Sequence, residues 1–257
     1  MSSEHGLALW VEVGDAGGEL ERFLLDTGQH PATLAANAAR AGVSLCTASA
    51  VVLSHGHYDH TGGLPALASA GVSCPVFLGV DAERGRFSAQ VGVGADGRRM
   101  IKPIGLPSPG ALASLRVSRV SGVARVSPRL TLFSLPVPAP PNVRLLAADG
   151  RSADTFSDEV FALVSDGAKV MLFGGCTHHG LPLLLRYVFA ELGVPRVDCF
   201  VGGLHLQGRT LDDVRAVADV AAAYDVRSYA LLHCTGDLAR EVWRGRFNVT
   251  DGFDFRL

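Results

Sequence analysis

The sequence lacks the features of a membrane-spanning or nucleic-acid-binding protein. None of its apolar runs reaches the roughly 18 to 20 residues that a membrane-spanning helix needs. It contains no strongly basic run, and its net charge is −2, so neither a membrane nor a nucleic acid is an expected partner. The first residues also lack the basic start and long apolar stretch of a signal peptide.

Cysteine is scarce: there are five in 257 residues, an odd number at wide spacing. Such a set does not form the disulfide framework of a small secreted protein. We therefore expect reduced thiols and a cytoplasmic location. Hydrophobic residues make up 48% of the chain, which is enough to bury a large core.

Two parts of the sequence, about residues 1–80 and 129–257, alternate β-prone apolar runs with helical patterns. The first part predicts strands over 7–13, 21–28 and 48–56, and a helix over 31–42 that begins with proline and ends with glycine. The second predicts a hairpin over 159–176 and a helix over 210–225 with Thr210 as its N-cap. This alternation predicts one α/β (α+β) domain, residues 1–257, in which helices pack on sheets.

Residues 82–128 interrupt this pattern. Glycine, serine, proline and arginine dominate, and the periodicity is weak, which is typical of a long loop. We expect a lid or an insertion here. Its cationic side chains either attract a phosphorylated or carboxylated substrate or serve only surface solubility: Arg84, Arg86, Arg98, Arg99 and Lys102.

Three of the nine histidines stand within six positions, in the segment SHGHYDH over residues 54–60. Alternate residues of an extended chain point the same way, so His55 and His57 can bind one metal ion together. The chain then turns and directs Asp59 and His60 towards a second ion. Imidazole and carboxylate are the ligands of zinc and similar divalent metals. A solvated polar loop is the alternative, but it does not explain all four positions directly behind a predicted strand.

Histidines at the ends of three later strands can complete such a site. His178 and His179 follow one apolar strand, and His205 and His233 each follow another. A single histidine at such a position is more often structural than a ligand. Three strand ends in register favour a shared metal site at one edge of the sheet.

The segment SHGHYDHTGG resembles the H-x-H-x-D-H signature of the metallo-β-lactamase superfamily. The resemblance implies a four-layer αββα sandwich with the metal site at the sheet edge. The segments LLDTGQ, GGCTHHG, GGLHL and LLHCTG look like one branch of that superfamily. This branch of metal-dependent hydrolases is named for 7,8-dihydropterin-6-methyl-4-(β-D-ribofuranosyl)aminobenzene-5'-phosphate synthase.

The resemblance also implies two divalent metal ions, zinc or alternatively manganese or iron. Its pattern assigns the first ion to His55, His57 and His178, and the second to Asp59, His60 and His233. Cys176 stands where many members place a bridging aspartate, and a metal-bound thiolate and a buried neutral thiol are equal alternatives. His179 is the alternative to His178 as a ligand, and otherwise a candidate for binding substrate.

Asp26, Thr27 and Gly28 form the Asp-Thr-Gly sequence of aspartic proteases as well. That mechanism needs two such loops to share a proton, and this chain has one copy. In the metal interpretation, Asp26 hydrogen-bonds and orients a ligand from beneath. Gln29 and His30 then line the cleft and bind substrate.

These features predict a hydrolase in which a metal-activated water attacks an ester, phosphoester or related bond of a small molecule. Asp59 would be both ligand and proton acceptor, and His205 would donate a hydrogen bond to an oxyanion or leaving group. The branch suggests a phosphorylated substrate of the dihydropterin-aminobenzoate type. A metal-bound ligand sensor with little turnover and a mononuclear iron oxygenase are the alternatives. The sequence does not indicate an oligomeric state.

Overall fold

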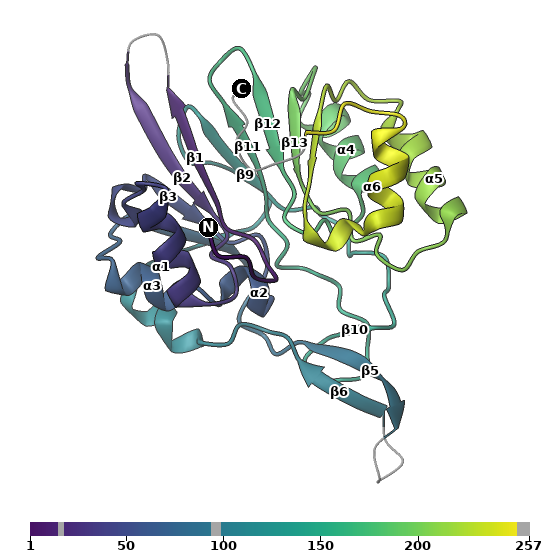
Figure 1. Ribbon diagram of the computed structural model, residues 1–257, viewed down its shortest axis with the longest axis horizontal. Coiled ribbons are helices and arrows are strands. Elements are labelled where there is room, and N and C mark those ends of the chain that lie inside the picture. The colour runs from purple at the N-terminus through teal and green to yellow at the C-terminus, as the bar shows by residue number, and fades with distance from the viewer. Residues whose placement is uncertain (15–17, 94–98, 251–257) are drawn as a thin grey trace. The chain divides into compact units, whose positions relative to one another are not determined.

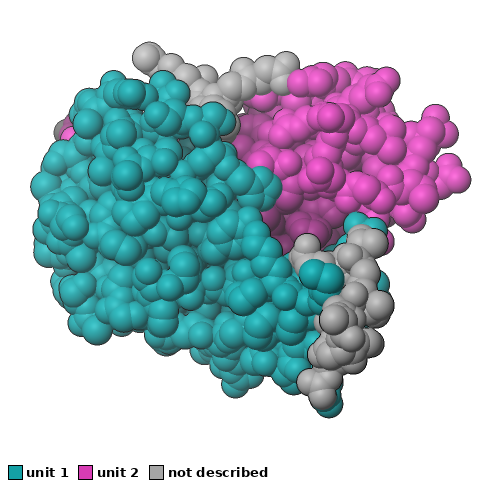
Figure 2. Space-filling view, turned by 60° about the horizontal axis from the view of Figure 1, so that its bottom comes forward, with its two compact units in different colours: residues 1–10, 23–119, 137–158 teal, residues 11–22, 120–136, 159–257 magenta. Residues whose placement is uncertain are grey.

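A computed structural model describes residues 1–14, 18–93 and 99–250 (Figure 1). The chain divides into two compact units, which are coloured separately in Figure 2. Unit 1 comprises residues 1–10, 23–119 and 137–158, and unit 2 comprises residues 11–22, 120–136 and 159–257. Within the described ranges, no helix is both long enough and apolar enough to cross a membrane.

The main sheet of unit 1 has five strands in the order β1-β2-β3-β4-β7. These strands are β1 (Leu9–Gly14), β2 (Leu20–Leu25), β3 (Ala50–Val52), β4 (Pro75–Gly79) and β7 (Arg116–Val120). The outer end of the β1–β2 hairpin is counted with unit 2. β2, β3 and β4 run parallel, and all three residues of β3 are buried, as its continuous apolar run predicts.

The first helix of unit 1 follows the prediction of a helix that begins with proline, whereas the single helical turn and the 3-10 helices described below were not predicted. α1 (Pro31–Arg40) begins at its proline and carries Arg40 in its last turn, where a cation complements the helix dipole. α2 (Tyr58–Thr61) is a single turn, and α3 (Leu64–Ser69) follows it. Two 3-10 helices complete the set, η1 (Leu45–Thr47) and η2 (Pro109–Ser114). Leu34 of α1 and Leu67 of α3 share a core with Val51 and Val76 of the sheet.

The segment 82–128 contains more regular structure than its composition predicts. β5 (Phe87–Val93) and β6 (Arg99–Pro103) form an antiparallel pair, and β10 (Leu145–Leu146) adds to β5. β7 and β8 (Val123–Arg125) join larger sheets. The expectation of a long loop was therefore wrong for these strands, because β5 alternates apolar with polar or glycine residues over 87–93 and pairs with β6. Residues 94–98, including Arg98, lie outside the described residues, and a lid function stays a prediction.

Unit 2 is built on a six-stranded sheet in the order β14-β13-β12-β11-β9-β8. Its further strands are β9 (Leu130–Phe133), β11 (Phe161–Ser165), β12 (Val170–Phe173), β13 (Cys199–Gly202) and β14 (Tyr229–Leu231). β11 and β12 form the predicted hairpin, with Ser165 opposite Val170. β12, β13 and β14 run parallel.

The helices of unit 2 pack on this sheet (Figure 1). They are α4 (Leu181–Arg186), the π-helical turn η3 (Tyr187–Glu191), α5 (Leu211–Ala221), η4 (His233–Thr235) and α6 (Asp237–Arg244). Thr210 caps α5 as predicted: its side chain accepts from the Asp213 N–H, and the Asp213 carboxylate accepts from the Thr210 N–H. Leu184, Val214 and Trp243 bring α4, α5 and α6 into one core with Phe200 of β13.

Each unit gathers its polar residues where parallel strands end. In unit 1, Asp26 follows β2 directly, and Ser54 and His55 stand just beyond β3. In unit 2, Cys176 lies beyond β12 and His233 follows β14. Because parallel neighbours end at the same edge of a sheet, each fold brings together residues that are distant in sequence.

Candidate functional site

The HxHxDH segment of unit 1 folds into a buried group of imidazoles. His55 and His60 are fully buried, and His57 is nearly so. The His55 ring centroid lies 4.5 Å from that of His57 and 4.3 Å from that of His60. The Phe156 ring closes one side of the group, with its centroid 5.5 Å from that of His57. The segment therefore collects three imidazoles behind β3, and their role as metal ligands stays a prediction.

The Asp59 carboxylate faces two imidazole nitrogens. Asp59 Oδ2 lies 3.6 Å from Nε2 of His60 and 3.4 Å from Nε2 of His5. Two ligands of a tetrahedral zinc ion, each at roughly 2.1 Å, stand about 3.4 Å apart, so these atoms are spaced like ligands of one ion. His5 escaped the sequence analysis because it lies far from any motif. The backbone bond from Leu7 N to Asp59 O, 3.1 Å long, brings it there.

Asp26, which was predicted to orient a ligand, hydrogen-bonds to His60 and Ser54. Its Oδ2 lies 2.6 Å from Nδ1 of His60, and its two carboxylate oxygens accept from the Ser54 N–H at 2.6 Å and the Ser54 hydroxyl at 2.7 Å. With its proton on Nδ1, a neutral His60 presents Nε2 as a lone-pair donor. Asp26 adopts a left-handed φ of 60°, which costs backbone energy in a non-glycine residue and is characteristic of functional sites.

The two glycines that end the motif allow close backbone approach. A Cβ atom on Gly62 would overlap the carbonyl oxygen of Gln29, and one on Gly63 would overlap that of Thr27. The backbone bond from Thr27 N to His60 O, 2.8 Å long, joins the same two loops. The loop after β2 and the histidine motif therefore pack backbone against backbone, which positions Asp26 beneath His60.

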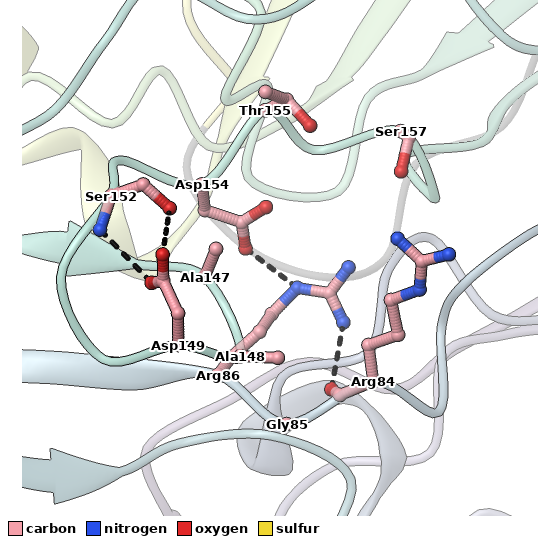
Figure 3. A pocket seen from close by; sticks show the side chains of 10 residues that line it. All are labelled: Arg84, Gly85, Arg86, Ala147, Ala148, Asp149, Ser152, Asp154, Thr155 and Ser157. Atoms are coloured by element: carbon pink, nitrogen blue, oxygen red, sulfur yellow. Dashed lines mark hydrogen bonds and ion pairs between the residues drawn. The ribbon is translucent and has the colours of Figure 1, made fainter.

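A buried ionic network of Arg86, Asp154 and Asp158 also holds the histidine motif in place. Asp158 Oδ2 accepts the N–H of Gly56 at 2.7 Å, and its Oδ1 lies 2.5 Å from Nη2 of Arg86. Arg86 Nε donates to Asp154 at 2.6 Å, an interaction that Figure 3 shows together with the bond from Arg86 to the Arg84 carbonyl. Arg86 is therefore a buried structural cation. Neither of the two alternatives for Arg86, attraction of a substrate or surface solubility, holds, because its side chain is buried and pairs with two carboxylates.

The predicted substrate residues Gln29 and His30 share one carboxylate partner. Glu4 accepts the backbone N–H of Gln29 at 2.7 Å and that of His30 at 3.2 Å, and it contacts Nδ1 of His30 at 3.0 Å. Burial alone would raise the pKa of Glu4, but hydrogen bonds from Thr33, Gln29 and His30 lower it below its usual value. Gln29 lines a groove, described below, whereas His30 is exposed at the surface of unit 1.

In unit 2, two cysteines and a histidine form a second group. Donor atoms of Cys176, His233 and Cys234 all lie within 4.8 Å of one another. Cys176 Sγ is 3.7 Å from Nε2 of His233, and Cys234 Sγ approaches the Cys176 carbonyl at 3.8 Å. Cys234 was not singled out from the sequence, although it adjoins a predicted ligand. Thiolate and imidazole together favour zinc or another soft divalent metal.

The neighbouring histidines His178 and His179 have different surroundings. His179 is buried, with its Nδ1 2.6 Å from Glu159 Oε2, and its ring lies edge-on to Phe161. His178 is half-buried, and its ring centroid is 4.4 Å from that of His205. His205 has a left-handed φ of 49°. Such strained backbone positions of non-glycine residues are concentrated at functional sites. Unit 2 thus holds His178 and His205 together, while His179 faces Glu159 and the core.

The donor chemistry of both groups fits divalent metal ions. Buried imidazoles, a carboxylate spaced like a co-ligand, and a carboxylate behind one imidazole are the components of a protein metal site. In unit 1, burial and the adjacent Asp59 charge raise the pKa of the Tyr58 phenol.

Comparisons with known proteins agree with the predicted fold. Residues 7–76 match the model of the metallo-beta-lactamase superfamily. A protein of Methanocaldococcus jannaschii named 7,8-dihydropterin-6-methyl-4-(beta-D-ribofuranosyl)-aminobenzene-5'-phosphate synthase is 23% identical, over 95% of this chain and 85% of its own.

Solved structures give the same result. Tm1679, a metal-dependent hydrolase of the beta-lactamase superfamily, matches with a TM-score of 0.76 at 24% identity, over 98% of this chain and 90% of that chain. The metallo-beta-lactamase fold protein YhfI of Bacillus subtilis matches with a TM-score of 0.55 at 12% identity, over 97% and 91%. The resemblance to the superfamily and the mixed α/β fold are thereby confirmed.

Proposed function

From the metallo-β-lactamase fold and the buried imidazole group, we propose that this protein is a cytoplasmic, metal-dependent hydrolase. Its substrate is a small molecule with an ester, phosphoester or related bond. The observation that carries the proposal is the grouping of His55, His57 and His60 behind β3, with Asp26 fixing His60 and Asp59 facing its Nε2. Surface polarity does not explain three imidazoles that are buried together.

Divalent metal ions bound here would lower the pKa of a water molecule and polarise the substrate oxygen. The protein residues supply the remaining functions. Asp26 holds the His60 proton on Nδ1, and Asp59 accepts a proton from the attacking water. His205, beside His178, donates a hydrogen bond to the developing oxyanion or leaving group.

The division of ligands stays a prediction. We propose His55, His57 and His178 for one ion, and Asp59, His60 and His233 for a second, with zinc as the metal and manganese or iron as alternatives. Cys176 contacts His233, which supports a thiolate in the second set. His5, which faces the Asp59 carboxylate, is a further candidate in that set.

The substrate class is proposed from the relative's name alone. The Methanocaldococcus jannaschii relative is named as the synthase of a dihydropterin aminobenzene phosphate compound. A phosphorylated pterin or aminobenzoate derivative is therefore the first specific substrate to test, beside general phosphodiesters, phosphomonoesters and esters.

Metal analysis and turnover test the proposal together. The purified protein should contain divalent metal and hydrolyse at least one compound of such a panel. His57→Ala should lose metal and turnover together, because it removes a buried imidazole. His30→Ala changes an exposed histidine outside the imidazole group and should keep the metal content of the wild type.

Three outcomes would contradict the proposal. A His57→Ala protein with full metal content and activity would remove its basis. One iron ion per chain would favour the oxygenase, and a metal-loaded protein that binds a metabolite tightly but hydrolyses nothing would favour the sensor.

A further inference from the structure

A groove in unit 1 adjoins the histidine motif and has features that the proposed chemistry does not use. Its volume is about 570 Å³, large enough for a small organic molecule. Tyr58, which stands between His57 and Asp59 in the sequence, forms part of its wall, so the groove reaches the motif. The groove is lined mainly by residues 83–87, which lead into β5, and by the end of β6 and the residues after it, with Gln29 and Tyr58.

Lys102 brings a positive charge to this groove. Its Nζ lies 5.5 Å from the centroid of the Tyr58 ring, within the range of a cation–π interaction. The backbone secures this arrangement, because Tyr58 N donates to Ile104 O at 2.9 Å and Ile104 N donates to Arg86 O at 2.9 Å. The end of β6 is thus anchored to the motif, while the Lys102 side chain is exposed to solvent and accessible to a ligand.

The other charges of the groove have carboxylate or guanidinium partners. Arg86 is buried between Asp154 and Asp158. Arg84 pairs with Asp81 at 3.0 Å, and Glu83 pairs with Arg119. Among the described groove residues, Lys102 is the cation that contacts an aromatic ring rather than a carboxylate, so its ammonium is available for an anionic ligand group.

The remaining walls of the groove are apolar. Phe87 is half-buried and stands opposite Pro103 in the β5–β6 register. Leu106 and Pro107 continue this surface. The groove therefore combines the Lys102 cation with the apolar side chains of Phe87 and Leu106. This combination favours a ligand that has an anionic group and a hydrophobic part.

We propose that Lys102 and Tyr58 form an anion subsite that selects the substrate. The ligand is an organic anion whose carboxylate or phosphate group lies at Lys102 and whose apolar part lies against Phe87 and Leu106. This inference rests on the proposed function, in that it treats the adjoining motif as the reaction centre. It assigns substrate selection to Lys102 of β6 and to Tyr58, rather than to the histidines and Asp59 of the motif.

The two lysines of the chain provide a matched test, because Lys169 is exposed on the turn between β11 and β12 of unit 2. Binding of phenyl phosphate and of benzoate is measured by calorimetry on the metal-loaded protein, with uncharged benzyl alcohol as a reference. Lys102→Met should weaken binding of one or both anions about tenfold or more, the value of one charge-assisted hydrogen bond. Lys169→Met should bind them as the wild type does, and Lys102→Arg should retain most of the affinity.

The two anions distinguish the ligand group. Tighter binding of phenyl phosphate identifies a phosphate subsite, and tighter binding of benzoate identifies a carboxylate subsite. Equal affinities of wild type and Lys102→Met for both anions would overturn the proposal. An equal loss in Lys169→Met would also overturn it, because the effect would then reflect net charge alone.

Repeating the titration on His57→Ala separates this inference from the proposed function. A Lys102-dependent affinity in that variant shows that the subsite binds anions without the metal. If the protein shows this affinity but hydrolyses nothing, the anion subsite is supported and the proposed hydrolase function is contradicted. If Lys102→Met retains the full metal-dependent turnover and the full anion affinity, the hydrolase is supported and the subsite is contradicted.

Discussion

Glu159 Oε2 lies 2.6 Å from Nδ1 of His179, and the same carboxylate accepts the backbone N–H groups of His178 at 2.7 Å and His179 at 3.0 Å. Glu159 is fully buried, so these bonds are shielded from water. One carboxylate therefore fixes the turn that presents both histidines, and it holds one of the two rings directly. The preceding residue, Asp158, serves unit 1 by accepting the Gly56 N–H.

Glu159→Gln should destabilise the protein. Glutamine has one acceptor oxygen for three donors, and its amide N–H₂ would face a donor, so a buried group loses its partner. We expect a loss of about 1–3 kcal/mol in the free energy of unfolding, measured in urea. The exposed Glu191→Gln variant is the control and should unfold like the wild type. Unchanged stability of Glu159→Gln would show that the turn does not depend on this carboxylate.

His178→Ala and His179→Ala should differ in metal content. His178 lies against His205 and is the proposed ligand, so its removal should lower the metal bound per chain. His179 is buried against Glu159 and Phe161, so its removal should lower stability instead. Metal analysis of both variants, purified in parallel, decides the assignment. Loss of metal in His179→Ala alone would reverse it.

Asp26→Asn should weaken metal binding without removing a ligand. The variant keeps the shape of the side chain but loses the charge that holds the His60 proton on Nδ1. Such partners of metal-bound histidines typically contribute about 10–100-fold in metal affinity. Competition with a chelator measures this change, and the exposed Asp212→Asn variant serves as the control. Equal affinities of Asp26→Asn and wild type would exclude this role.

Asp158→Ala should be among the most destabilising single changes in unit 1. It leaves the Arg86 guanidinium, which is 3% exposed, without one of its two carboxylates. Removing one partner of a buried ion pair typically costs about 3–5 kcal/mol. Glu12→Ala is the matched control, because its pair with Arg22 is largely exposed and should contribute less than about 1 kcal/mol. Similar losses in both variants, measured by chemical denaturation, would contradict the structural role of Arg86.

Glu4 should make stability depend on acid pH. Its pKa in the folded protein lies below the usual 4.5, so its hydrogen bonds stabilise the fold fully above that pH. This contribution is lost as the pH falls through the lowered pKa. The difference in unfolding free energy between wild type and Glu4→Gln should therefore be largest at neutral pH and shrink as the pH falls below 4.5. A difference that stays constant over this range would show that the charge of Glu4 is not involved.

Local patterns predicted most elements because their signals lie within a few residues. Pro31 marked the start of α1, Thr210 the cap of α5, and the turn after Ser165 the β11–β12 hairpin. The ribbon of β5 and β6 was missed although Phe87, Ala89, Val91 and Val93 alternate with Ser, Gln and Gly, because the Gly-, Ser-, Pro- and Arg-rich composition of the whole segment outweighed this short pattern. Arg86 was misread for a related reason: sequence shows a charge but not its burial.

The histidine motif could be recognised in the sequence because its residues are neighbours. The metal-binding chemistry that imidazole and carboxylate share could be inferred from the same residues. The contacts of the carboxylates that hold the motif could not be predicted, because each carboxylate comes from a distant segment that folding brings close. Asp26 reaches His60 across 34 residues, and Asp158 reaches Gly56 across 102. Thus the sequence determined the donor types, the strand that precedes them and the family resemblance. Only the tertiary structure decided that Glu159 holds His179, that His5 faces Asp59 and that Lys102 stands over Tyr58, since such contacts depend on the packing of strands and loops that no local pattern encodes.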